Sequence, residues 1–293
     1  MASENHIDKA GEDWLDGSLP TQLDLRTRVA VVTGGTGGIG RATCLALARE
    51  EIKAVGVADI SSNVDDFCRA GNERIGREVL YPYRGDVIET GFRRSVFFDL
   101  ERRFGTVSIC VPAAAITRDR LAVRMNKILG EPEIYSEDEF RLVMRVDLLA
   151  PIYWAMETIA SVARDRFKKD LKKWTPSEGV QGAIIFIGSV SSTGNRGQIS
   201  YATAKAGLHG AQATLAMEAM FYGVRSAILH PGYTDTPLVR ALGREFVHRS
   251  ILPHTQLGRL IDPAEIAQAI VFMIRNSAVS GQLWADAGWH PAP

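Results

Sequence analysis

Short apolar runs alternate with amphipathic stretches along the chain from residue 28 onward. Seven runs rich in β-branched residues predict strands at 28–33, 53–59, 79–83, 107–112, 182–189, 224–230 and 281–286. Helical spacing of apolar residues predicts helices at 38–50, 63–77, 89–103, 200–221 and 262–275, and a long helical region that ends near residue 171. Apolar strands separated by helices predict a parallel sheet of about seven strands with helices on both faces. Right-handed crossovers make such a sheet doubly wound.

The domain organisation follows from the same pattern. Residues 1–25 are polar and acidic without a clear period, so we interpret them as an N-terminal arm. Residues 26–293 form one predicted α/β domain. Within this domain, residues 232–257 carry Leu238, Val239, Leu242, Phe246, Ile251 and Leu252, and we expect them to form an apolar substrate lid or a helix pair packed on the domain. The loop at 117–136 is longer than the pattern requires.

Composition excludes several classes of protein. Lysine plus arginine equals aspartate plus glutamate at 34 each, so we expect no nucleic-acid partner. The three cysteines and six histidines lack the spacing of a disulfide framework or a metal site. The first 18 residues lack the basic and apolar regions of a signal peptide, and no run of about 18 apolar residues is long enough to span a bilayer. We therefore expect a cytoplasmic protein without a membrane partner.

A glycine-rich loop connects the first strand to the first helix. It reads Thr-Gly-Gly-Thr-Gly-Gly-Ile-Gly at 33–40. Glycine lets the backbone approach a pyrophosphate, and the helix N-terminus that follows offers free N–H groups. The strand, loop and helix together predict a dinucleotide site on a Rossmann fold. Its expected binding residues are Gly34, Thr36, Gly38, Ile39 and Gly40.

Two acidic residues follow the next two strands. Asp59 ends the second strand, 19 residues after Gly40, where a carboxylate can accept hydrogen bonds from both adenosine ribose hydroxyls and repel a 2′-phosphate. Ile60 follows it instead of a basic residue, so the sequence favours NAD over NADP. Asp86 ends the third strand beside Val87 and can bind the adenine amino group. Either carboxylate can instead cap a helix or turn.

A tyrosine and a lysine lie four residues apart on a predicted helix. Tyr201 and Lys205 therefore share a face, and the ammonium, with the positive nicotinamide ring, stabilises a phenolate. Tyr201 is thus a candidate acid/base, although such a pair also occurs on solvent-facing helices. Ser189 ends a strand 12 residues earlier and can donate to a substrate oxygen; Ser191 and Ser192 are rival candidates.

Together these motifs resemble the short-chain dehydrogenase/reductase family from about Arg28 to Trp289. The matching segments are TGGTGGIG at 33–40, the Ser…YxxxK segment at 189–205, HPGYTDTP at 230–237 and GQLWADAG at 281–288. The segments TRDRLAVRM at 117–125 and GRLIDPAEIA at 258–267 look most like the 3-oxoacyl-carrier-protein reductase branch.

The resemblance implies an activity and roles for residues. The chain is expected to transfer a hydride between NAD(H) and a secondary alcohol or ketone carbon, in a partly apolar substrate. Tyr201 would donate the proton, Lys205 would bind the nicotinamide ribose, and Ser189 would bind the substrate oxygen. The nicotinamide carboxamide would meet Pro231, Gly232, the backbone of Tyr233 or Thr234, and the side chain of Thr236. A homo-oligomer, a tetramer or dimer built on the long helices, is implied as well.

The chain departs from the family pattern at two places. Ala113, Ala114 and Ala115 replace the usual Asn-Ala-Gly, although Ala113 and Ala114 stay in the expected cofactor set. Asp147 replaces an asparagine that helps hold a proton-relay water. If Asp147 lies near Lys205, it should raise the lysine pKa and weaken that relay.

These departures keep a second hypothesis open. The chain can be a non-catalytic or weakly active NAD-binding protein with the same fold. A third reading, an epimerase or dehydratase of the extended branch, matches the glycine spacing. However, only about 60 residues follow Pro231, fewer than that branch usually has.

Overall fold

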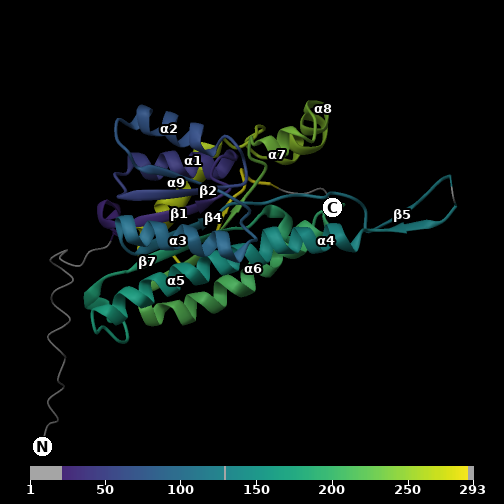
Figure 1. Cartoon of the computed structure of the whole chain (residues 1–293). Coiled ribbons are helices and arrows are strands. Elements are labelled where there is room, and N and C mark those ends of the chain that lie inside the picture. The colour runs from purple at the N-terminus through teal and green to yellow at the C-terminus, as the bar shows by residue number, and fades with distance from the viewer. Residues whose placement is uncertain (1–21, 129, 290–293) are drawn as a thin grey trace, which may run out of the picture.

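Seven parallel strands form the central sheet of the computed structural model, which describes residues 22–128 and 130–289 (Figure 1). The strand order is β3-β2-β1-β4-β7-β8-β9. The strands are β1 Val29–Thr33, β2 Ala54–Asp59, β3 Leu80–Arg84, β4 Val107–Pro112, β7 Gly182–Ile187, β8 Val224–Pro231 and β9 Gly281–Ala285. β1 pairs with both β2 and β4, so the chain reverses its direction of growth beside β1, where doubly wound sheets bind ligands.

Helices cover both faces of the sheet. They are α1 Gly38–Arg49, α2 Val64–Ile75, α3 Thr90–Phe104, α4 Glu137–Met144, α5 Ala150–Lys168, α6 Ile199–Glu218, α7 Pro237–Arg240, α8 Arg244–Phe246 and α9 Pro263–Arg275. Helices α1, α2 and α9 lie on one face, and α3, α5 and α6 lie on the other (Figure 1).

Strand residues alternate between the two layers. In β1, Ala30 and Val32 join the core under α1 and α9, while Val29 and Val31 join the core under α3 and α5. Because both faces are covered, β1 is apolar at each of these positions, which is the pattern that predicted a parallel sheet. The predicted single-domain doubly wound fold is confirmed, and each predicted strand lies within about two residues of an observed one.

A β-hairpin was not predicted. β5 Val123–Met125 and β6 Pro132–Ile134 pair antiparallel within the long loop at 117–136 and project away from the body (Figure 1). Both strands are exposed along their length, so no buried apolar pattern announces them.

The long helical region differs in detail from the prediction. It consists of α4, a π-helical turn at Arg145–Leu149, and α5. The stretch Glu137–Lys168 is long and apolar enough by composition to cross a membrane, contrary to the expectation from the sequence. However, Trp154 and Val162 pack into the core beneath the sheet, as in the core helix of a globular protein.

The chain before β1 is tied to the domain. Leu23 and Leu25, the last part of the expected N-terminal arm, are buried in the core beside α9. Residues 1–21 of that arm and the final residues 290–293 lie outside the described residues.

Candidate active site

A pocket of about 570 Å³ opens at the carboxyl ends of the strands. It is lined by every residue predicted to bind cofactor or substrate except Asp147, which lies beneath it. These lining residues are Gly34, Thr36, Gly38, Ile39, Gly40, Asp59, Asp86, Val87, Ala113, Ala114, Ser189, Tyr201, Lys205, Pro231, Gly232, Thr234 and Thr236. The rule that ligands bind at these strand ends therefore selected one continuous surface from residues spread over the whole chain.

The glycine loop is built so that side chains do not fit. Gly34 has a φ of +62°, and a Cβ there would lie 2.7 Å from the Ala114 Cα. A Cβ on Gly40 would overlap the Gly34 carbonyl, and one on Gly38 would overlap Thr236. The loop therefore closes tightly on itself at the N-terminus of α1, leaving a cradle of the kind that a pyrophosphate fills.

Asp59 braces the same loop. One carboxylate oxygen accepts hydrogen bonds from the Thr36 backbone N–H at 2.9 Å and from its hydroxyl at 2.8 Å. The other oxygen accepts from the Ser61 N–H at 2.9 Å. The predicted ribose acid and the predicted turn role thus coexist in one side chain. Ile60 lies beside it and is exposed.

Asp86 and the alanine triplet complete the adenosine side. Asp86 accepts a hydrogen bond from the Ile88 N–H at 3.1 Å, the capping role predicted as its alternative. The Ala113 N–H donates to the Thr33 carbonyl, and the Ala114 N–H donates to the Thr33 hydroxyl, both at 3.2 Å. Residues 113–115 adopt no positive φ, so alanine follows β4 here without backbone strain.

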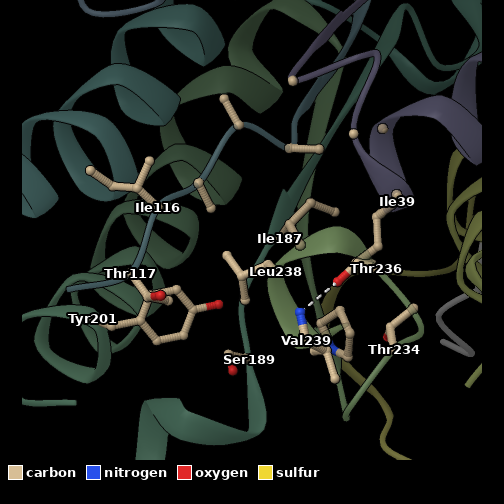
Figure 2. A pocket seen from close by; sticks show the side chains of 18 of the residues that line it. Ile39, Ile116, Thr117, Ile187, Ser189, Tyr201, Thr234, Thr236, Leu238 and Val239 are labelled. Atoms are coloured by element: carbon tan, nitrogen blue, oxygen red, sulfur yellow. Dashed lines mark hydrogen bonds between the residues drawn. The ribbon is translucent and has the colours of Figure 1, made fainter. Parts of the chain in front are cut away.

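Tyr201 and Lys205 share a face of α6, as their spacing predicted. Figure 2 shows the Tyr201 hydroxyl pointing into the pocket. The Lys205 Nζ lies 5.5 Å from the centre of the Tyr201 ring and donates to the Ile187 carbonyl at 3.0 Å. Burial lowers the pKa of Lys205 while Asp147 acts against that shift. Burial, followed by the charge of Asp147, raises the pKa of Tyr201, and the Ser189 hydroxyl acts to lower it.

Asp147 lies near Lys205, which satisfies the condition stated for it above. It occupies the π-helical turn and is fully buried. One oxygen accepts from the Ile116 N–H at 2.9 Å, and the other lies 3.8 Å from the Lys205 ammonium without a hydrogen-bond partner. Burial raises the pKa of Asp147 to about 6, and Lys205 opposes that shift.

Among the three candidate serines, Ser189 lies at the end of β7 with its side chain lining the pocket. Its hydroxyl accepts from the Ser191 N–H at 3.0 Å and caps the short 3₁₀ turn that follows. Ser192 donates its hydroxyl back to the Ser189 carbonyl instead of facing the cavity. Ser191 lines the pocket but is fixed by contacts within the turn, so Ser189 is the serine placed beside Tyr201.

The loop after β8 closes the nicotinamide side. Pro231, Gly232 and Thr234 line the pocket, and the Thr234 hydroxyl donates to the Gly232 carbonyl at 3.0 Å. The Thr236 hydroxyl accepts from the Val239 N–H at 3.4 Å and caps α7 (Figure 2). The first part of the predicted lid thus begins at a residue predicted to bind the cofactor.

The substrate side contains residues that the motifs did not identify. They follow β4 or face it from α4 and α6: Ile116, Thr117, Arg118, Asp119, Leu142, Val146 and Gln198. The predicted lid adds Leu238, Val239 and Leu242, whereas Val247 and Ile251 form a small core of their own. A loop at the carboxyl end of β4 was the available signal for the first group. No cluster of potential metal ligands occurs among the residues that the structure describes.

Comparison with known proteins decides the family. A family model described as enoyl-(acyl carrier protein) reductase matches residues 34–290. The chain belongs to the short-chain dehydrogenase/reductase family. It is 32% identical over 260 residues to a 3-oxoacyl-[acyl-carrier-protein] reductase of Salmonella typhimurium, covering 87% of this chain and 93% of the relative. It is also 32% identical over 264 residues to carbonyl reductase family member 4 of Danio rerio, covering 89% and 98%.

A solved structure shares the fold of this family member. A short-chain type dehydrogenase/reductase from Mycobacterium marinum superposes with a TM-score of 0.74 at 23% identity, covering 90% of this chain and 96% of the other. The chain is thus an oxidoreductase of a family that binds a nicotinamide dinucleotide, and its fold and family are those that the sequence predicted.

Proposed function

We propose that the chain transfers a hydride between NAD(H) and a secondary alcohol or ketone carbon, with Tyr201 as the acid/base. The observation that carries the proposal is the Tyr201 hydroxyl, which faces the pocket beside Ser189 with the Lys205 ammonium behind its ring. Two hydroxyls at one point of a cavity can hold one substrate oxygen, and a cation nearby assists the phenolate.

The bound nicotinamide would supply or accept the hydride, and the chain does the remainder. Ser189 orients the substrate oxygen and Tyr201 gives it a proton in reduction or takes one in oxidation. Because burial raises the pKa of Tyr201, the phenol is protonated at neutral pH in the protein alone, which favours ketone reduction. Lys205 holds positive charge beside the ring and lies where it can bind the nicotinamide ribose.

The adenosine end supports NAD over NADP. Asp59 and Ile60 line it, and the basic residues among the pocket lining are Arg118 and Lys205, which belong to the substrate side. Arg41, just beyond the glycine loop, has its guanidinium over the Phe67 ring at 5.2 Å from the ring centre. No lining cation therefore awaits a 2′-phosphate.

The apolar lining supports a partly hydrophobic substrate. Ile116, Leu142, Val146, Leu238 and Leu242 surround the space next to Tyr201. The named relatives include reductases of 3-oxoacyl groups on acyl carrier protein and a carbonyl reductase, so β-keto thioesters and simple ketones are the first compounds to test. A cytoplasmic location is part of the proposal and agrees with the three buried, free cysteines, Cys44, Cys68 and Cys110.

A panel assay tests this function. Purified protein is given NADH with ketones and β-keto thioesters, or NAD⁺ with secondary alcohols, and absorbance at the reduced nicotinamide band is followed. Turnover is expected, with Tyr201→Phe lowering kcat by about a hundredfold or more. Tyr153→Phe, on the exposed face of α5, is the matched control and keeps its activity.

The second candidate is a non-catalytic NAD-binding protein. It is motivated by Asp147 and by Ala113–Ala115, where the family pattern is altered. Cofactor binding without Tyr201-dependent turnover across the whole panel would favour that role over the enzymatic one.

A further inference from the structure

His230 lies directly behind the turn that carries Ser189. It is the penultimate residue of β8, it is fully buried, and it does not line the pocket. Its Nδ1 accepts a hydrogen bond from the Ser189 backbone N–H at 3.3 Å and lies 3.3 Å from the Ser192 hydroxyl. A single imidazole nitrogen therefore contacts both ends of the turn that starts at Ser189.

Neighbouring groups hold the imidazole in place. The ring stacks on Trp284 with centres 4.3 Å apart, and the His209 ring lies 4.6 Å away. On its other side it packs against the Gly188 backbone so closely that a Cβ at that position would overlap the ring. With β7 and β8 also joined by the Gly188 N–H and the Leu229 carbonyl at 2.7 Å, the ring has little freedom to move.

The charge state of His230 suits an acceptor. Burial, followed by the nearby His209, lowers the pKa of His230 to about 4. At neutral pH the ring is therefore neutral, and Nδ1 keeps the lone pair that the Ser189 N–H needs.

We propose that His230 is a positioning residue that anchors the Ser189 backbone and so aims the Ser189 hydroxyl at the substrate oxygen. The proposal rests on the function proposed above. The Ser189 backbone is extended, and its hydroxyl caps the next turn, so its direction depends on where the backbone N–H is held. A hydroxyl displaced by a fraction of an ångström loses its alignment with Tyr201, and such errors are costly in catalysis. His230 contacts neither substrate nor cofactor space and acts through Ser189.

Two substitutions separate this role from simple packing. His230→Leu fills the space but removes the acceptor, whereas His230→Asn offers an amide oxygen close to the place of Nδ1. Each is made alone and together with Ser189→Ala in the full chain. With a substrate from the panel, we expect His230→Leu to lower kcat about tenfold and to leave the NADH Kd unchanged, and His230→Asn to recover most of that loss.

The double variant gives the decisive comparison. If His230 acts through Ser189, adding His230→Leu to Ser189→Ala costs less than about twofold, because the hydroxyl it aims is already gone. An equal loss of kcat in both backgrounds, or no rescue by asparagine, overturns the proposal.

Amide hydrogen exchange provides a readout that needs no turnover. In His230→Leu the peptide that contains Ser189 should exchange faster than in the wild type, and in His230→Asn it should not. Unchanged exchange in a folded His230→Leu variant overturns the anchor; if that variant does not fold, His230→Ala replaces it. Absence of Tyr201-dependent turnover in the wild type would instead contradict the proposed function, and the exchange data would still test His230.

Discussion

At the scale of single residues, Asp147 changes the electrostatics of the acid/base. Its buried carboxylate lies 3.8 Å from Lys205 and acts to raise the pKa of Tyr201. A negative charge disfavours the phenolate, so removing the charge should lower the pKa of Tyr201. Asp147→Asn keeps an oxygen for the Ile116 N–H, and we expect the midpoint of the pH–rate profile for alcohol oxidation to move to lower pH.

The graded control for this prediction is Asp119→Asn. Asp119 also acts to raise the pKa of Tyr201, but less than Asp147 does. Its removal should shift the same midpoint in the same direction by a smaller amount. An upward shift in Asp147→Asn would mean that Lys205 had lost its proton, and it would contradict the prediction.

Asp59 governs cofactor choice at the same scale. We expect Asp59→Asn to improve the ratio of NADPH to NADH affinity about tenfold, because the charge that repels a 2′-phosphate is gone. Asparagine still offers an oxygen to Thr36, which limits damage to the glycine loop. Fluorescence titration with both reduced cofactors measures the ratio, and Asp86→Asn should leave it unchanged. A ratio that stays constant in Asp59→Asn would remove the ribose assignment.

At the scale of elements, the central strands and the covering helices were predictable because burial on two faces leaves a strong apolar pattern. The hairpin β5–β6 was not, because its strands bury nothing and pair Val123 with Ile134 and Arg124 with Glu133 in the open. The site residues followed from the strand ends. The contacts that tie them together did not: Asp59 on Thr36 and His230 on Ser189 join residues far apart in the chain.

The loop between β1 and α1 supports a prediction about this element. Gly40→Ala places a methyl group on the Gly34 carbonyl, so the loop must open and we expect NADH affinity to fall at least about tenfold. Gly91→Ala in α3 is the matched control, because nothing lies within 4 Å of its added Cβ. It should keep full affinity and unfold at an equal or higher temperature. Equal affinities in both variants would contradict the proposed phosphate cradle.

At the scale of the whole molecule, the helical face opposite α1 and α9 carries exposed apolar side chains. Leu149, Tyr153 and Met156 lie along one side of the π-turn and α5, at spacings that place them together, and are 47%, 48% and 45% exposed. Met217 and Phe221, on and just after α6, are exposed as well. Apolar surface of this kind is typical of an interface, so we propose a homo-oligomer formed through α5 and α6.

Substitution on this face tests the assembly. Met156→Arg places a charge at the centre of the proposed interface, and burying an unpaired charge costs enough to separate the subunits. Light scattering after gel filtration should show an oligomer for the wild type and a smaller species for Met156→Arg. Phe246→Arg in α8, 49% exposed and outside α5 and α6, should leave the mass unchanged. If the wild type is a monomer, or if Met156→Arg keeps the wild-type mass, the face between α5 and α6 is not the interface.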